Sequence, residues 1–223
     1  MSTKITVLNA SGKFNHVLGL LESKAQDSLI EIEKHIVLPN LDIVISPCLE
    51  EYKNESGIMG SASPQVYVID IGLDSDRKDL VDIINNKLTA VIAHEIHHVL
   101  RSTSGVKENK LFQVLISEGL ACHFETKFNK HAVNEFFDEV RKYEWLDLYN
   151  KMQTNLENTD FNYPVFFGGK DVTKFPNRAG YWVGFNLVSE YIDRFGGCAI
   201  TLVGTPAEEL VVAVEKVFKT RMK

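Results

Sequence analysis

The segment Leu88-Thr-Ala-Val-Ile-Ala-His-Glu-Ile-His-His-Val-Leu-Arg101 contains the pattern His-Glu-x-x-His at residues 94–98. It has no proline or glycine, and good helix formers fill most of its positions, so we expect it to be helical. On a helix, His94 and His98 lie about 40° apart around the axis and about 6 Å apart along it, so both imidazoles can reach one metal ion. Glu95 lies at the flank of the same face, where its carboxylate can take a proton from a water molecule at that metal.

The same pattern also arises by accident, and its surroundings help to separate the two interpretations. The chain has seven histidines in 223 residues, so a chance match is a real alternative. Apolar residues flank the histidines on both sides and indicate a packed helix rather than a solvated one: they are Val91, Ile92, Val99 and Leu100. The context therefore favours a metal site. His97 points about 60° away from His94, so we expect it to have a supporting or structural role.

A catalytic zinc ion needs a third protein ligand and one open position for water. Glu118 is the candidate, because it lies in an expected helical segment, residues 112–124, among apolar residues, where a carboxylate is costly unless paired or bound to metal. Gly119 beside it indicates a close approach of another element. The alternatives for Glu118 are an exposed helical charge and a salt bridge to Arg101. Two histidines and one carboxylate predict a site for one zinc ion per chain.

Three motifs resemble a known family. They are HEIHHVLR at residues 94–101, ISEGLA at 116–121 and AGYWVGFNLVSEYI at 179–192. Together they resemble the YjaZ-like family of predicted zinc-dependent proteases, over roughly residues 57–195. The His-Glu-x-x-His pattern, followed after nineteen residues by Glu118, is similar to that of the gluzincin class of zinc metallopeptidases. The resemblance implies a zincin-like fold, with His94, His98 and Glu118 as zinc ligands and Glu95 as the general base.

A peptidase also needs a hydrogen-bond donor for the oxyanion that develops as water attacks the peptide carbonyl. Tyr181 is the candidate, because it begins the family-like helix at residues 179–192 and a phenol can donate to an anion. His123 and His131 are alternative donors. Tyr181 is otherwise expected to be a core aromatic residue, with Gly180 and Gly184 forming a close helix contact.

Composition indicates one soluble globular domain over residues 1–223. The chain is 44% hydrophobic and 24% charged, which is enough apolar material for a substantial core. Its net charge of −6 argues against nucleic acid or an anionic membrane as the main partner, and no apolar run approaches the length of a membrane span. Cys48, Cys122 and Cys198 are odd in number and scattered, which predicts a reducing, cytoplasmic setting. Cys122 is expected to be a small buried residue, with an approach to the metal as the alternative.

Hydrophobic periodicity predicts an α+β fold: a small mixed sheet with helices in residues 1–75, then a mainly helical part in residues 76–223 that holds the metal site. We expect strands at residues 5–8, 41–45 and 65–71, and a flexible small-residue loop at 57–63. The expected helices are 13–36, 77–103, 111–127, 132–155, 179–195 and a last one beginning near residue 206, with residues 156–178 irregular.

The strand at residues 65–71 has two possible roles. Zinc peptidases commonly hold an extended substrate by adding it as a strand to an exposed sheet edge. Pro64 and Asp70 suit such an edge, because both discourage pairing with stray chains. The alternative is an ordinary buried strand. Residues 57–63, beside it, would then be either a simple loop or the lip of the substrate cleft.

These features predict a zinc-dependent hydrolase, above all a metallopeptidase that cleaves peptide or protein substrates through water activated by the metal and Glu95. One alternative is a zinc-binding or regulatory interaction domain without catalysis. Another is a zinc amidase or esterase that acts on a small acyl substrate, because the same metal centre serves either reaction.

Overall fold

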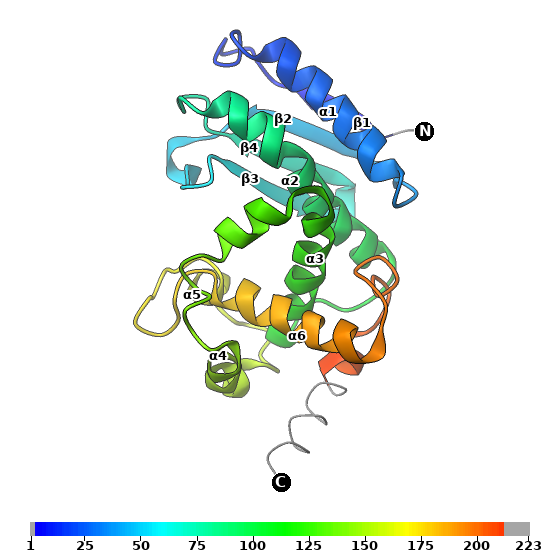
Figure 1. Ribbon diagram of the computed structural model, residues 1–223, viewed down its shortest axis with the longest axis vertical. Helices are drawn as coiled ribbons and strands as arrows, with labels where there is room; N and C mark the ends of the chain where they lie inside the picture. Colours follow the sequence, from blue (N-terminus) through cyan, green and yellow to red (C-terminus); the bar gives the residue numbers. More distant parts are fainter. Residues whose placement is uncertain (1–2, 212–223) are drawn as a thin grey trace. The chain divides into compact units, whose positions relative to one another are not determined.

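The computed structural model describes residues 3–211, and these residues fall into two compact units (Figure 1). The first unit contains the residues up to Leu100 together with Glu125–Ala132. The second contains Arg101–Phe124 and the residues from Val133 onward. The first unit holds the sheet and the second is helical, in agreement with the predicted α+β class. The organisation as a single domain stays a prediction.

The first unit is built on a mixed sheet of four strands in the order β1-β2-β4-β3. The strands are β1 (Lys4–Val7), β2 (Asp42–Pro47), β3 (Ile58–Ser63) and β4 (Val68–Leu73). Strands β1, β2 and β4 are parallel, and β3 pairs antiparallel with β4. The expected strands at 5–8 and 41–45 are therefore confirmed within one or two residues at each end.

The sequence prediction is wrong about residues 57–63. This stretch, expected to be a loop, contains strand β3, and β3 lies at the edge of the sheet. Of the two roles considered for the strand at 65–71, the structure has the ordinary interior strand: it is β4, which begins only at Val68. Its start is delayed because Pro64–Val66 form one turn of 3-10 helix and Tyr67 adopts a left-handed conformation with φ of 56°. The backbone hydrogen bonds that pair β3 with β4 do not depend on its side chains. Because most of those side chains are small, the sequence shows no alternation of polar and apolar residues there.

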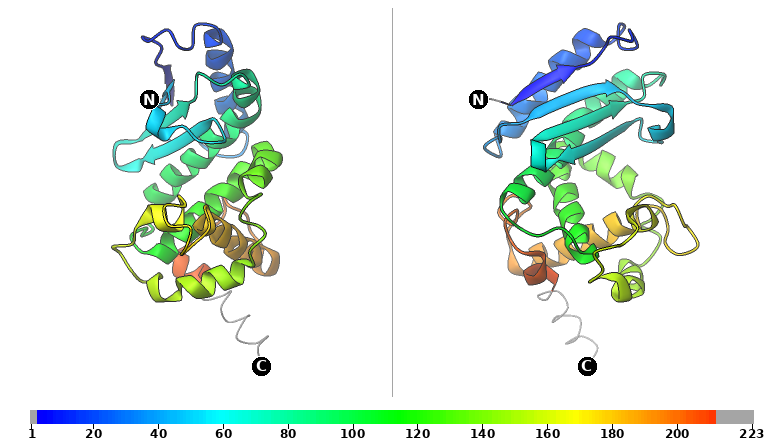
Figure 2. Two further views of the ribbon diagram at one scale, coloured as in Figure 1. Left: turned by 90° about the vertical axis from the view of Figure 1, so that its left-hand side faces the viewer. Right: turned by 180° about the vertical axis from the view of Figure 1, so that it is seen from behind.

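Two helices, α1 (Leu18–Glu33) and α2 (Leu80–Thr103), cover one face of the sheet (Figure 2, left). Side chains alternate across the strands, so one face of β2 and β4 is apolar and fully buried: Ile43, Ile45, Ile69, Ile71 and Leu73. Burial of each such side chain contributes about 1.5–3 kcal/mol. Helix α1 is shorter than the expected 13–36, because residues 9–17 form turns in which the Asn9 side chain accepts a hydrogen bond from the Phe14 N–H (2.9 Å).

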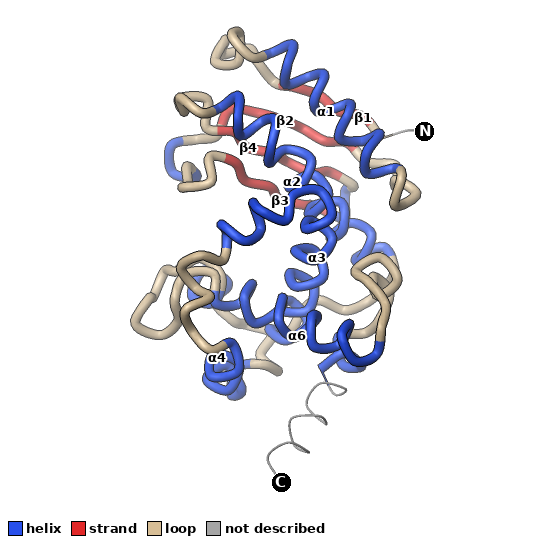
Figure 3. The backbone as a smooth tube through the Cα atoms, in the orientation of Figure 1, coloured by secondary structure: helices blue, strands red, loops and turns tan. Residues whose placement is uncertain are grey.

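The second unit contains most of α3 (Leu111–Phe136), together with α4 (Trp145–Met152), α5 (Tyr163–Phe166) and α6 (Ala179–Phe195). The bounds expected for α6 are confirmed, and Gly196, with φ of 78°, ends it. The continuous helix expected at 132–155 is wrong: α3 kinks at Asn129, and turns at 137–144 precede α4. Residues 156–178 are largely irregular, as expected, and appear mainly in tan in Figure 3.

The last expected helix begins at residue 207, and its continuation from residue 212, where Val214, Val217 and Phe218 were expected to face inward, lies outside the described residues. Among residues 3–211, no helix has both the length and the apolar character needed to cross a membrane.

Helices α3 and α6 touch through two glycines. A Cβ atom on Gly119 would lie 2.3 Å from the Gly184 carbonyl oxygen, and a Cβ on Gly184 would lie 1.9 Å from the Leu115 carbonyl oxygen. Both distances are far below van der Waals contact, and both neighbours are backbone atoms that cannot rotate away. The close approach predicted from Gly119 is therefore confirmed, and its partner is Gly184. The same helix face carries Gly180, whose Cβ would meet the Phe167 ring at 2.5 Å.

We expect Gly184→Ala to destabilise the protein by about 3 kcal/mol, because the added methyl group forces α3 and α6 apart. Thermal unfolding should then shift down by roughly 6–12 °C. Gly19→Ala is the matched control, because Gly19 is also helical and a Cβ there meets nothing within 4 Å. That control should be neutral or slightly stabilising. Equal stability of the two variants would contradict the close contact.

Candidate metal centre

The His-Glu-x-x-His pattern lies within α2, and its two outer histidines share one side of that helix. The His94 and His98 rings have centroids 4.9 Å apart and are inclined at 66°. Both side chains are half-buried. His97 is fully buried, which is consistent with the structural role expected for it. The first unit therefore brings two imidazoles together where each keeps some access to solvent.

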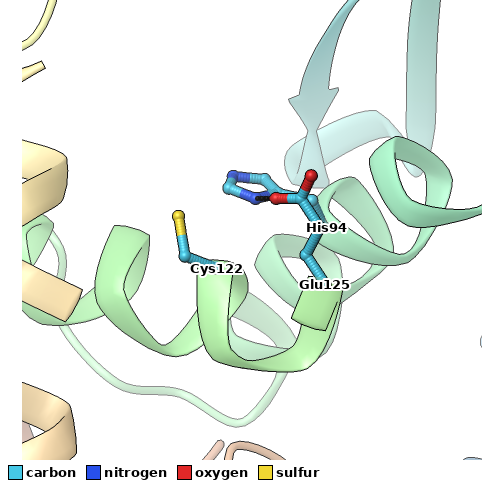
Figure 4. Close-up of side chains that lie close together, drawn as sticks. All are labelled: His94, Cys122 and Glu125. Atoms are coloured by element: carbon cyan, nitrogen blue, oxygen red, sulfur yellow. Dashed lines mark hydrogen bonds and ion pairs between the residues drawn. The ribbon is translucent and has the colours of Figure 1, made fainter. Parts of the chain in front are cut away.

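Glu125 holds the His94 ring in place, and sequence reasoning did not identify it. Its Oε2 lies 3.0 Å from His94 Nδ1 (Figure 4). A carboxylate in this position accepts a hydrogen bond from Nδ1–H, so the free lone pair of the neutral His94 ring is on Nε2. Glu125 is seven residues after Glu118 in the continuous part of α3, which is a spacing of two helical turns. This spacing from Glu118 is the feature of the sequence from which Glu125 could have been identified.

The Glu95 side chain lies against the edge strand of the sheet. Glu95 is only 7% exposed. A Cβ atom on Gly60, in β3, would lie 2.5 Å from Glu95 Oε1 and 2.6 Å from its Cγ. The carboxylate therefore occupies space next to the backbone of β3 that any side chain at position 60 would fill.

In the second unit, Glu118 is buried and accepts a hydrogen bond from a tyrosine. It is 7% exposed, and the Tyr163 hydroxyl donates to its Oε1 at 2.9 Å. This contradicts the alternative of an exposed helical charge. Arg101, the salt-bridge partner considered for Glu118, is fully buried, donates to the Val203 and Thr205 carbonyls and lies 3.3 Å from Glu108. Burial lowers the pKa of Arg101, although the Glu108 carboxylate opposes that effect.

Tyr163 also joins Glu118 to Tyr181. The two tyrosine hydroxyl oxygens lie 2.7 Å apart, and Tyr181 is in the first turn of α6. Burial, followed by the neighbouring Glu118 carboxylate, raises the pKa of Tyr163 well above its usual value, so its hydroxyl keeps the proton that it donates. Sequence reasoning missed Tyr163, because it lies in an irregular segment without periodicity. It placed Tyr181 correctly at the start of a helix, although the catalytic role of Tyr181 stays a prediction.

The two alternative donors have different surroundings. His123 Nε2 lies 3.0 Å from both the Phe185 carbonyl oxygen and Ser189 Oγ, and its ring stacks on Phe185 at 4.2 Å. A carbonyl oxygen can only accept a hydrogen bond, so His123 Nε2 carries a proton and donates it in that bond. The bond links α3 to α6. Burial lowers the pKa of His123, which keeps the ring neutral. His131 is exposed in the first unit. The described contacts of His123 therefore favour a packing role.

Comparison with known proteins adds a family assignment to this geometry. A family model described as "Predicted Zn-dependent protease (DUF2268)" matches residues 23–212. The uncharacterized protein YjaZ of Bacillus subtilis (strain 168) is 28% identical over 148 residues, which are 60% of this chain and 53% of YjaZ. The chain thus spans about half the length of this curated relative. No solved structure matches the chain. The resemblance to the YjaZ-like family is confirmed.

Proposed function

Because the chain belongs to the family of predicted Zn-dependent proteases, we propose that it is a zinc metallopeptidase of the gluzincin type with a zincin-like fold. One zinc ion per chain is held by His94, His98 and Glu118. The observation that carries this proposal is the pair of imidazoles on one side of α2, with His94 oriented by a carboxylate. Metal-binding histidines almost always donate a hydrogen bond in this way, from the N–H of the ring nitrogen that does not bind the metal.

The donor set fits zinc. Two neutral imidazoles and one carboxylate are a ligand combination that leaves a fourth position open for water. Glu118 fits the third place because it is a buried carboxylate, and a carboxylate oxygen is a zinc ligand; the Tyr163 hydroxyl donates to its Oε1 and so helps to orient it. Helix α3 carries both Glu118 and, seven residues later, Glu125, whose carboxylate contacts His94.

The proposed mechanism gives each residue one task. Zinc, when bound, polarises the scissile carbonyl and lowers the pKa of water. Glu95 accepts the proton of the attacking water and delivers it to the leaving amine. Tyr181 donates a hydrogen bond to the developing oxyanion, and Tyr163 holds both the Tyr181 hydroxyl and the Glu118 carboxylate. Glu125 keeps His94 in the tautomer that leaves Nε2 for the metal.

We further propose that the substrate is an extended peptide added as a strand to β3. Strand β3 lies at the sheet edge, and its residues after Met59 are Gly60, Ser61, Ala62 and Ser63, whose small side chains leave the backbone accessible. Glu95 lies against this strand. An added peptide would run past the general base and gain affinity from main-chain hydrogen bonds that do not depend on its sequence. Strand β3 thus takes the binding role that was one of the two alternatives for residues 65–71.

Metal content and metal-dependent cleavage test this function together. We expect about one zinc per chain after dialysis, measured by elemental analysis, and chelator-sensitive cleavage of an unfolded protein such as casein. Removal of zinc should also lower the midpoint of thermal unfolding, since a metal bound to the native state stabilises it. Zinc without cleavage of casein or peptide libraries would favour a non-catalytic zinc domain or an acyl substrate of another class. A chain that binds no zinc would contradict the proposal.

A further inference from the structure

Gly60 is unusual among the glycines of the sheet, because the space beside it belongs to a reactive side chain. Gly60 lies inside β3, and its backbone does not need the left-handed conformation that favours glycine. A glycine inside a strand weakens that strand and often marks a position that another group approaches closely. That group is visible in the surroundings of Gly60: the three atoms nearest to an added Cβ are Oε1, Cγ and Cδ of Glu95, at 2.5, 2.6 and 2.8 Å.

The other glycine of the sheet shows the contrast. A Cβ on Gly72, in β4, would meet Met59 Cγ at 3.1 Å and Cys48 Sγ at 3.5 Å, which are packing contacts with uncharged side chains. At Gly60 the clash is shorter, and the three nearest atoms all belong to one carboxylate side chain. That side chain is enclosed by its neighbours, since only 7% of Glu95 is exposed. A side chain at position 60 would therefore have to displace Glu95 itself.

We propose that Gly60 is a positioning residue for the general base: its missing side chain leaves the space in which the edge strand β3 holds the Glu95 carboxylate. This inference rests on the proposed function, and it adds a requirement that the metal motif alone does not contain. The strand that receives the peptide also fixes the group that takes the proton from water. An added peptide would therefore pass closest to the Glu95 carboxylate where it pairs with residue 60 of β3.

A double-mutant cycle on the zinc-free protein tests the contact without any measurement of activity. Gly60→Ala should lower the midpoint of thermal unfolding by roughly 2–6 °C in the wild-type background. The same substitution should leave the midpoint unchanged, or raise it, in the Glu95→Ala background, where the space is free. The same change in both backgrounds, whatever its size, overturns the proposal.

Activity of the zinc-loaded protein tests the consequence. Gly60→Ala should retain its zinc and lose about 100-fold in kcat for casein cleavage, because displacement of the base by about 1 Å is enough to cost that much. In the Glu95→Asp background the shorter side chain clears the methyl group, so the same substitution should cost less than about 10-fold. The control is Gly19→Ala, which adds a methyl group to a residue of helix α1 where nothing lies within 4 Å, and it should stay within about twofold of wild type.

The outcomes separate the two proposals. If wild-type protein binds zinc but cleaves nothing, the proposed function fails, and the stability cycle still decides whether Gly60 makes room for Glu95. If wild type cleaves casein and Gly60→Ala cleaves it equally well, the positioning role fails and the peptidase function stands. An equal loss in the wild-type and Glu95→Asp backgrounds also overturns the positioning role, because it assigns the effect to β3 rather than to the base.

Discussion

Glu95→Gln is expected to retain about one zinc per chain and to lose about 10³-fold or more in casein cleavage. Glutamine has the shape of glutamate, so it still fits the space beside Gly60. Its amide is not basic enough to take a proton from water, and general acid–base catalysis of this kind contributes about 10²–10⁴-fold. The same change removes the proton donor for the leaving amine. Both tasks fail in one substitution while the imidazoles of His94 and His98 are untouched.

Glu125→Gln is the matched control for that variant, because it makes the same chemical change at the carboxylate that contacts His94. Loss of such a supporting carboxylate typically costs about 10–100-fold in metal affinity or activity. We therefore expect Glu125→Gln to require more zinc for half-maximal activity and to recover most of its turnover when zinc is saturating. Full turnover by Glu95→Gln would remove Glu95 from the mechanism.

The parts of the site predicted from sequence are those fixed by local helix geometry. The spacing of His94 and His98 places them on one side of any regular helix, and α2 is regular there. Glu118 and Gly119 were recognised because a carboxylate and a glycine are both unfavourable among apolar helical residues unless they meet a partner. The structure supplies partners for both: the Tyr163 hydroxyl for Glu118 and the backbone of Gly184 for Gly119.

The parts that were missed depend on contacts with other segments of the chain rather than on local periodicity. Strand β3 was read as a loop because its small residues carry no hydrophobic alternation, and only its pairing with β4 makes it a strand. Tyr163 lies 45 residues after Glu118, in the one-turn helix α5. Such a short helix has no hydrophobic periodicity by which it could be predicted. Gly60 looks like any loop glycine until the position of Glu95 is known. In each case the sequence contains the residue but not the neighbour that gives it a role.

The second large effect is the loss of zinc binding that we expect when Glu118, the proposed third ligand, is replaced. Glu118→Ala removes a negatively charged ligand and should weaken zinc binding by more than the 10–100-fold that loss of a supporting residue costs. Glu118→Gln preserves the size of the side chain and an oxygen that can accept from Tyr163, so it keeps the packing of α3 while it removes the charge. Both variants should emerge from dialysis with little or no zinc by elemental analysis.

Thermal unfolding distinguishes a lost ligand from a damaged fold. Zinc-free Glu118→Gln should unfold close to the midpoint of the zinc-free wild type, since it keeps the size of the side chain and an oxygen that accepts from the Tyr163 hydroxyl. Addition of zinc should raise the midpoint of wild type and leave that of Glu118→Gln nearly unchanged, because the stabilisation depends on affinity. Tyr163→Phe is the control: it removes the hydrogen bond to Glu118 but no ligand, so zinc should still stabilise it, at about 10–100-fold higher concentration. Unchanged zinc content in Glu118→Ala would show that another residue completes the site. If zinc fails to raise the midpoint of thermal unfolding only in the Glu118 variants, the carboxylate on α3 is the ligand.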